Sequence, residues 1–280
     1  MFIKKVRRLY RPLWIRFLMK WVDFRFNHNK RLDVHKHKLN YELIVSLTSY
    51  PARFKNLHLT LKCLLMQTVQ ADRVILWVAH EDKAKLPVSV LRLEKFGLEI
   101  RTTGDIRSYK KLIPALKMFP NAGFIIVDDD LFYPRNLIEN LLITAEKFSG
   151  SAVAGRVHRV RRDDFGQVLP YKKWYWNSNL QQSSDNFYTG CGGAFFPPNA
   201  FHPEVLNQSN FMELAPTADD VWFNWMLKLN QTPVVSTESE FVFWDWPDTQ
   251  STSLHKKNVS EHGNDRQIAN MVKQYGQCYT

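Results

Sequence analysis

Cysteine is scarce in this sequence and widely scattered. The 280 residues contain three cysteines, Cys63, Cys191 and Cys278, and no CxxC pair. An odd number of distant cysteines predicts neither a disulfide framework nor a zinc site, and it favours a reducing compartment. Disorder is also excluded, because an apolar content of 45% and an aromatic content of 14% suffice for a large core.

Sequence motifs of two common enzyme classes are missing as well. No GxSxG nucleophile elbow and no GxxxxGK(S/T) phosphate loop occurs, which disfavours a serine hydrolase and a P-loop nucleotidase. The histidines His158, His202, His255 and His262 have no HxxxH or HxxE partner. Of these, only His255 is considered as an extra metal ligand.

An excess of charge of one sign is nearly absent from the body of the chain. The formal net charge is +11, but residues 1–40 hold twelve Lys/Arg against two Asp. The remaining residues hold 26 Lys/Arg against 25 Asp/Glu. A nucleic-acid-binding body would carry its basic patch on the folded domain, so no nucleic-acid partner is predicted.

The basic leader, residues 1–40, has apolar residues at helical spacing. Basic residues interrupt every apolar run, so we expect neither a membrane span nor a signal peptide. An amphipathic helix of this composition suits an anionic membrane surface. Residues 1–30 are therefore predicted to hold a cytoplasmic protein on the inner face of the plasma membrane; the alternative is a helix that packs on the body or on a partner. The expected apolar face consists of Val6, Leu9, Tyr10, Leu13, Trp14, Phe17, Leu18 and Trp21.

From residue 41 onward, short apolar runs alternate with segments of helical period. This alternation predicts an α/β fold with a doubly wound, mostly parallel sheet. We divide the chain into the leader 1–40, a first half 41–150, and a loop-rich second half 151–280 whose tail after 245 is expected to wrap the surface. Strands are expected at 43–47, 73–78, 98–101 and 124–127, and helices at 55–68, 87–96, 108–118, 134–148 and 218–229.

Three adjacent carboxylates, Asp128-Asp129-Asp130, follow the apolar run 124–127. In open parallel sheets, ligands bind beyond the carboxyl ends of the strands. Asp128 and Asp130 are two residues apart, so on an extended chain they project the same way. Hard oxygen donors suit Mg²⁺ or Mn²⁺, with substrate phosphates completing the shell. The segment predicts a metal-dependent enzyme acting on a phosphate-bearing donor; the alternative is a solvated acidic loop.

A second acidic pair, Asp219-Asp220, opens the helix expected over 218–229. Acidic residues in a first helical turn stabilise the helix, and Thr217 is a plausible N-cap. This structural role explains the pair completely. The functional alternative is that one of the two carboxylates is a general base, which must then face the metal site across a cleft.

Polar side chains also follow the first strands. Thr48 and Arg53 leave the first strand, where Arg53 can meet a phosphate. Asp82 leaves the second strand and can accept hydrogen bonds from a base or a ribose. Lys111 lies near a helix start, where an anion is favoured. Each of these side chains has ordinary surface solvation as its alternative.

Taken in order, these motifs resemble the nucleotide-sugar glycosyltransferases of the GT-A fold, and most closely the bacterial family-2-like enzymes that build surface polysaccharide. The likeness covers about residues 41–245, and it makes 41–150 the nucleotide-sugar-binding half and 151–280 the acceptor-binding half of one GT-A domain. It is carried by 44–50 with Gln67-Thr68, by 127–130 with Tyr133-Pro134, by the 190–193 loop, and by 218–220.

The resemblance implies a role for each acidic residue. Asp128 and Asp130 would hold Mg²⁺ or Mn²⁺ on the donor diphosphate, with Asp129 between them. One of Asp219 and Asp220 would be the base, with Asp220 preferred, although the family more often has Glu-Asp there. The nucleotide is commonly UDP.

The expected function is metal-dependent transfer of a sugar from a nucleotide diphosphate donor to a saccharide or lipid-linked acceptor in surface polysaccharide synthesis. Two alternatives stay open. One is a glycoside hydrolase that uses paired carboxylates and needs no metal. The other is a non-catalytic scaffold that docks on a membrane or an acidic polymer through the leader.

Overall fold

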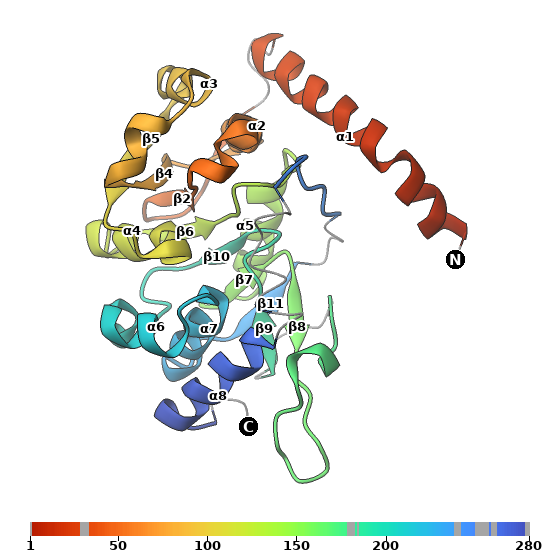
Figure 1. The fold of residues 1–280 in the computed structure, drawn as a ribbon. Helices are drawn as coiled ribbons and strands as arrows, with labels where there is room; N and C mark the ends of the chain where they lie inside the picture. Colours follow the sequence, from red (N-terminus) through yellow and green to blue (C-terminus); the bar gives the residue numbers. More distant parts are fainter. Residues whose placement is uncertain are drawn as a thin grey trace.

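A seven-stranded sheet forms the centre of the molecule (Figure 1). The computed structural model describes residues 2–28, 34–177, 183, 185–237, 242–249, 258 and 262–277, with the backbone alone for 2–9. Within these residues the strand order is β11-β7-β10-β6-β2-β4-β5. The strands are β2 (Leu43–Thr48), β4 (Arg73–Ala79), β5 (Leu98–Thr103), β6 (Gly123–Ile126), β7 (Ala152–Ala154), β10 (Ala194–Phe196) and β11 (Val234–Ser236). Two further two-stranded sheets pair β1 (His35–Lys36) with β3 (Val69–Gln70) and β8 (Val157–Arg159) with β9 (Asn186–Tyr188).

The central sheet is mostly parallel, as the sequence predicts. Strand β2 pairs in parallel with β4 and β6, β4 with β5, and β7 with β11. Only β10 runs antiparallel, between β6 and β7. The carboxyl ends of β2, β4 and β6 therefore meet at one edge, where a ligand site is expected in such sheets.

Helices cover both faces of this sheet because successive side chains of a strand point to opposite sides. In β2, Leu43, Val45 and Leu47 pack in one buried cluster with residues of α1, α2, α3 and α5. Ile44 packs in the other, with residues of α4, α6, α7 and α8. The helices are α1 (Phe2–His28), α2 (Phe54–Leu65), α3 (Val88–Leu91), α4 (Ile113–Met118), α5 (Leu137–Lys147), α6 (Gln208–Leu214), α7 (Asp219–Leu229) and α8 (Gly263–Tyr275).

Two expected helices differ from the structure at their starts. The helix expected from Pro134 begins at Leu137, because the carbonyl of Pro134 accepts a hydrogen bond from Gln67 Nε2 at 2.9 Å. Gln67 Oε1 in turn accepts from the N–H of Ile138 at 3.1 Å, which holds the new start. The helix expected over 108–118 is divided into a 3₁₀ helix, η4 (Arg107–Lys111), and α4.

The tail after residue 245 contains a helix, α8, that the sequence analysis did not identify. Ile268 and Met271 of α8 are buried against α7 and α6. Gln267 Oε1 also accepts hydrogen bonds from the N–H groups of Thr217 and Ala218, at 2.9 and 3.0 Å. Helix α8 therefore fixes the segment that leads into Asp219.

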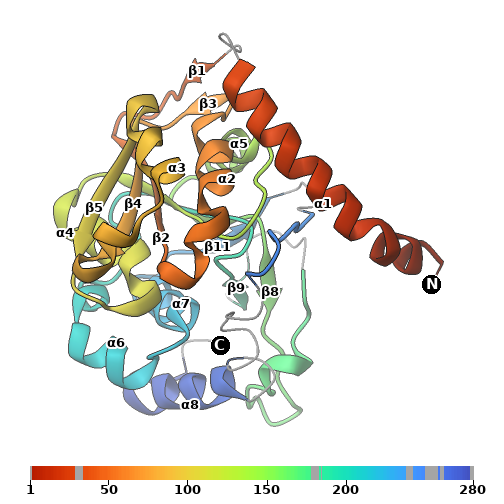
Figure 2. The ribbon, with the colours of Figure 1, turned by 45° about the horizontal axis from the view of Figure 1, so that its top comes forward.

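Residues 2–28 of the leader form one long helix, α1, that lies along α2 and extends beyond the body toward the N-terminus (Figure 2). The apolar residues of α1 do not form the single face expected from the sequence: some pack on the body and others are exposed. Ile15, Leu18 and Val22 are buried against the body. Trp21 packs there too, edge-on to Phe132 at 6.2 Å between ring centroids. The remaining described members of the expected face, Tyr10, Leu13, Trp14 and Phe17, are exposed.

Candidate active site

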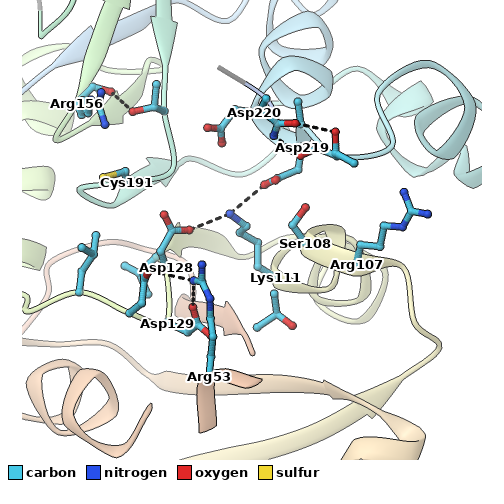
Figure 3. Close-up of a pocket in the computed structure, with 18 of the residues that line it drawn as sticks. Arg53, Arg107, Ser108, Lys111, Asp128, Asp129, Arg156, Cys191, Asp219 and Asp220 are labelled. Atoms are coloured by element: carbon cyan, nitrogen blue, oxygen red, sulfur yellow. Dashed lines mark hydrogen bonds and ion pairs between the residues drawn. The ribbon is translucent and has the colours of Figure 1, made fainter. Parts of the chain in front are cut away.

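A cavity of about 740 Å³ opens at the carboxyl ends of β2 and β6. Both halves of the chain contribute to its walls, so residues far apart in sequence meet there (Figure 3). Of the residues singled out from the sequence, Thr48, Arg53, Lys111, Asp128, Asp129, Asp130, Asp219 and Asp220 line this cavity.

The acidic triplet lies in a turn, not on an extended strand. Strand β6 ends at Ile126, and Asp129 and Asp130 form the turn that follows. The argument that Asp128 and Asp130 project alike because they share an extended chain is therefore wrong. All three side chains nonetheless line the cavity, and the turn gives them different partners.

Arg53 binds the second and third carboxylates of the triplet. Its Nη1 lies 2.7 Å from Asp129 Oδ1 and 3.1 Å from Asp130 Oδ2. Ser49 Oγ also donates to Asp129 Oδ2 at 2.5 Å. Burial raises the pKa of Asp129 and, against the attraction of Arg53, raises the pKa of Asp130 to about 7. The guanidinium of Arg53 is thus already engaged by protein carboxylates.

Lys111 joins the two acidic motifs. Its Nζ lies 3.1 Å from Asp128 Oδ1 and 2.9 Å from Asp219 Oδ2. Ser46, in the middle of β2, fixes the backbone of Lys111 by donating to its carbonyl at 2.5 Å. Burial lowers the pKa of Lys111, but Asp128 and Asp219 together raise it well above its usual value, so the ammonium stays charged.

Asp220 is held by the loop between β9 and β10. The N–H of Gly190 donates to Asp220 Oδ1 at 3.1 Å. A Cβ at Gly190 would come 3.2 Å from both this oxygen and Lys111 Nζ, so glycine permits the close approach. Burial, and next the negative charge of Asp219, raise the pKa of Asp220 to about 7. A carboxyl whose pKa is raised toward neutral pH has the property of a general base.

Asp245 and Arg11 belong to the cavity wall but were not singled out from the sequence. Asp245 Oδ2 pairs with Arg11 Nη2 of α1 at 2.5 Å, and both side chains line the cavity. A backbone bridge between Leu131 and Asp245 places this carboxylate beside the triplet, where it helps to raise the pKa of Asp130. Asp245 belongs to no motif, and only long-range pairing reveals it.

One predicted ligand residue, Asp82, stands apart from this site. Asp82 pairs with Lys85 at 2.8 Å within the 3₁₀ helix η2 (His80–Lys85), and it is not part of the cavity wall. The structure therefore does not bring it to the other candidates. His255 lies outside the described residues. Thr48 does reach the cavity, but its hydroxyl donates to the carbonyl of Trp77 at 2.9 Å.

The carboxylates fit a hard dication that also binds phosphate. Such ions use one or two carboxylates and complete their shell with phosphate oxygens and water. Asp128 and Asp130 supply this donor type, and Asp128 has the more exposed side chain, at 30%. Across the described part of the chain, no group of three or more His, Cys, Asp or Glu is placed to hold a metal ion by itself.

Comparison with known proteins identifies the fold. No protein-family profile and no curated protein sequence matches the chain. A mannosyltransferase from Pyrobaculum calidifontis, solved in complex with GDP-mannose and Mn²⁺, superposes with a TM-score of 0.53. The two are 14% identical, over 96% of this chain and 74% of that one.

Two cytidylyltransferase structures are also similar. The 2-C-methyl-D-erythritol 4-phosphate cytidylyltransferase of Thermus thermophilus has a TM-score of 0.45 at 15% identity, over 79% of this chain and all of that one. A 4-diphosphocytidyl-2C-methyl-D-erythritol synthase has a TM-score of 0.46 at 11% identity, over 76% and 97%. The likeness to the mannosyltransferase shows that this chain has a GT-A-like α/β fold with a mostly parallel sheet.

Proposed function

We propose that the chain is a metal-dependent glycosyltransferase that moves a sugar from a nucleoside diphosphate donor to a saccharide or lipid-linked acceptor. The observation that carries this proposal is the meeting of two acidic motifs in one cavity. Asp128–Asp130 and Asp219-Asp220 are far apart in sequence, yet Lys111 contacts both. The GT-A-like fold supports the same function.

The donor diphosphate belongs beside Asp128, Asp130 and Lys111. When bound there, Mg²⁺ or Mn²⁺ supplies charge neutralisation for the leaving diphosphate, which contributes several kcal/mol. Asp128 and Asp130 would hold the ion. Lys111 adds a permanent positive charge at the same place. Asp129 stabilises the turn by its ion pair with Arg53. The family resemblance favours a UDP-sugar, and the likeness to a GDP-mannose complex favours a GDP-sugar.

The acceptor belongs on the side of the cavity formed by the second half of the chain. Asp220 is the proposed base, since the N–H of Gly190 orients its carboxyl and its pKa lies near 7. Ionised Asp220 would take the proton of the acceptor hydroxyl as this hydroxyl attacks the anomeric carbon. Asp219 is the less suited candidate, because Lys111 binds its carboxylate.

A thermal-shift panel of nucleoside diphosphates tests the function. We expect UDP or GDP with Mn²⁺ to raise the melting temperature by about 5 °C or more at saturating ligand, because selective binding stabilises the folded state. The same nucleotide with EDTA should give a much smaller shift. Glycoside hydrolysis that is indifferent to EDTA and to nucleotides would instead identify a hydrolase.

We also propose that α1 holds the enzyme on an anionic membrane surface, at the inner face of the plasma membrane, in surface polysaccharide synthesis. Leu13 and Phe17 of α1 are 62% and 52% exposed, and Trp14 is 44% exposed. Exposed Arg16 and Lys20 lie on the same helix. Apolar and basic side chains together are typical of helices that lie in the membrane interface. Within the described residues, no helix combines the length and the apolar composition needed to cross a bilayer.

Flotation with liposomes tests this attachment. The triple substitution Leu13→Ala, Trp14→Ala and Phe17→Ala should lower recovery with anionic liposomes by about tenfold or more, because each side chain contributes on the order of 1 kcal/mol on insertion. Phe165→Ala is the matched control, since Phe165 is 89% exposed on a distant loop. Deleting residues 1–30 is a poor test, because it also removes the buried side chains of α1. Equal recovery of wild type and triple variant would refute membrane attachment through this face.

A further inference from the structure

Arg156 is an arginine of the cavity wall without a carboxylate partner among the described residues. It lines the cavity just before β8, and it lies on the far side of Cys191 from Asp128 (Figure 3). Four other cations of the wall bind Asp side chains: Arg11, Arg53, Lys110 and Lys111. Arg107 also lines the cavity, but it donates to the carbonyl of Pro216 at 2.9 Å. The ion pairs of the described chain include none with Arg156.

Aromatic rings fix the plane of the Arg156 guanidinium. Its Cζ lies over the ring of Trp176, 5.5 Å from the centroid, and over the ring of Phe243, 5.3 Å from the centroid. The ring of His158 packs on Trp176 with centroids 4.8 Å apart. An arginine that stacks on rings uses its faces for packing and presents its N–H groups at the edge.

Hydrogen bonds fix the position of the same side chain. Arg156 Nε donates to Asn177 Oδ1 at 3.1 Å, and the N–H of Asn177 donates to His158 Nδ1 at 3.3 Å. The thiol of Cys191 is a further neighbour of Arg156, but thiols are weak acceptors. No stronger acceptor for the terminal N–H groups is found among the described residues.

A single dipeptide connects Arg156 to the proposed base. The N–H of Thr189 donates to the carbonyl of Arg156 at 3.0 Å, and the N–H of the next residue, Gly190, donates to Asp220 Oδ1. The arginine and the base are thus held on the same short segment. Because both side chains line the same cavity, one extended molecule can contact both.

We infer that the acceptor carries an oxyanion, a phosphate or a carboxylate, that binds to Arg156 while its hydroxyl faces Asp220. This inference rests on the proposed function and names the chemical class of the acceptor. A planar guanidinium matches the two oxygens of such a group. Trp176, which is 38% exposed and also lines the cavity, offers a ring face beside it. The oxyanion can belong to a lipid-linked phosphate, to a soluble sugar phosphate or to a uronic acid.

Calorimetric titrations on the full chain distinguish these sources. The donor site is first saturated with Mn²⁺ and the nucleoside diphosphate that stabilises the protein most. Dodecyl phosphate below its micellar concentration, glucose 1-phosphate, glucuronate and uncharged methyl glucoside are then titrated separately. The variants are Arg156→Ala and, as a matched control, Arg161→Ala, whose arginine stacks on Tyr175 at 4.6 Å without lining the cavity.

We expect at least one anionic probe to bind about tenfold or more tightly than methyl glucoside, and Arg156→Ala to abolish this preference. Arg161→Ala should keep it, and the best probe identifies the source of the oxyanion. Equal binding of charged and uncharged probes, or a preference that survives in Arg156→Ala, would overturn the inference. If no nucleoside diphosphate binds, the proposed function fails separately, and the comparison of Arg156→Ala with wild type without nucleotide still decides the anion site.

Discussion

Replacing Asp220 by Asn is expected to lower the rate of sugar transfer about 10²–10⁴-fold, the usual contribution of a general base. The pKa of Asp220 is raised to about 7, first by burial and then by Asp219, so the carboxyl is protonated below about pH 7 and ionised above it. The wild-type rate should therefore rise as the pH increases through about 7. The Asn variant should lack this rise, and rate measurements from about pH 6 to pH 8 show whether it does.

Two control variants make this result specific. Asp248→Asn removes a carboxylate that is 72% exposed and forms an ion pair with exposed Lys55, so it should leave the pH profile unchanged. Asp219→Asn should lower the rate by loosening Lys111. It should keep the rise with pH but move it to lower pH, because the charge of Asp219 helps to raise the pKa of Asp220. If Asp219→Asn abolishes the rise and Asp220→Asn does not, the base is Asp219 and our assignment is wrong.

Replacing Asp128 by Asn is expected to lower Mn²⁺-dependent transfer by about 10³-fold, because charge stabilisation of several kcal/mol is lost. The substitution keeps the shape of a partly exposed side chain, so the melting temperature should change little. The nucleotide should also lose most of its Mn²⁺-dependent thermal shift. Transfer that stays fully dependent on Mn²⁺ in this variant, at a wild-type rate, would contradict the role of Asp128.

Asp129→Asn is the informative comparison within the same triplet. Asp129 is buried and binds both Arg53 and Ser49. Replacing the Asp129 carboxylate by an amide removes a negative charge that balances the positive charge of Arg53. We expect this to lower the free energy of unfolding by on the order of 3 kcal/mol. Chemical denaturation should thus show a clear loss of stability for Asp129→Asn and little change for Asp128→Asn.

Much of the fold could be predicted because local patterns determine it. The alternation of apolar runs and helical periods located β2, β4, β5 and α2 to within a few residues. Helix α8 was missed because its buried side chains, Ile268 and Met271, are few among polar residues. The start of α5 was missed because Gln67, from a distant segment, binds the turn ahead of it.

The candidate site could be predicted only where a motif marks it. Asp128 and Asp220 belong to acidic clusters that are unusual in sequence, and the structure brings both to one cavity. Asp245 and Arg156 reach the same cavity through long-range pairing, which leaves no local signal. Asp82 is the opposite case: it follows a strand, as a ligand residue often does, but it forms a local ion pair with Lys85 and does not line the cavity.

The leader shows why periodicity alone could not assign its partner. A 3.6-residue period identifies apolar residues on a helix, but it does not say what covers them. In α1 the body covers Ile15, Leu18 and Val22, whereas Leu13 and Phe17 stay exposed. One side of α1 thus packs on the body, as one sequence-based alternative expected. The other side keeps the exposed apolar residues on which the proposed membrane attachment depends.

The most direct measurement is anomalous diffraction at the manganese edge from crystals soaked with Mn²⁺ and the stabilising nucleoside diphosphate. Our account predicts one strong peak within bonding distance, about 2.1 Å, of carboxylate oxygens of Asp128 or Asp130 and of diphosphate oxygens. A nucleotide bound in the cavity with no manganese beside these carboxylates, or manganese bound elsewhere, would contradict it.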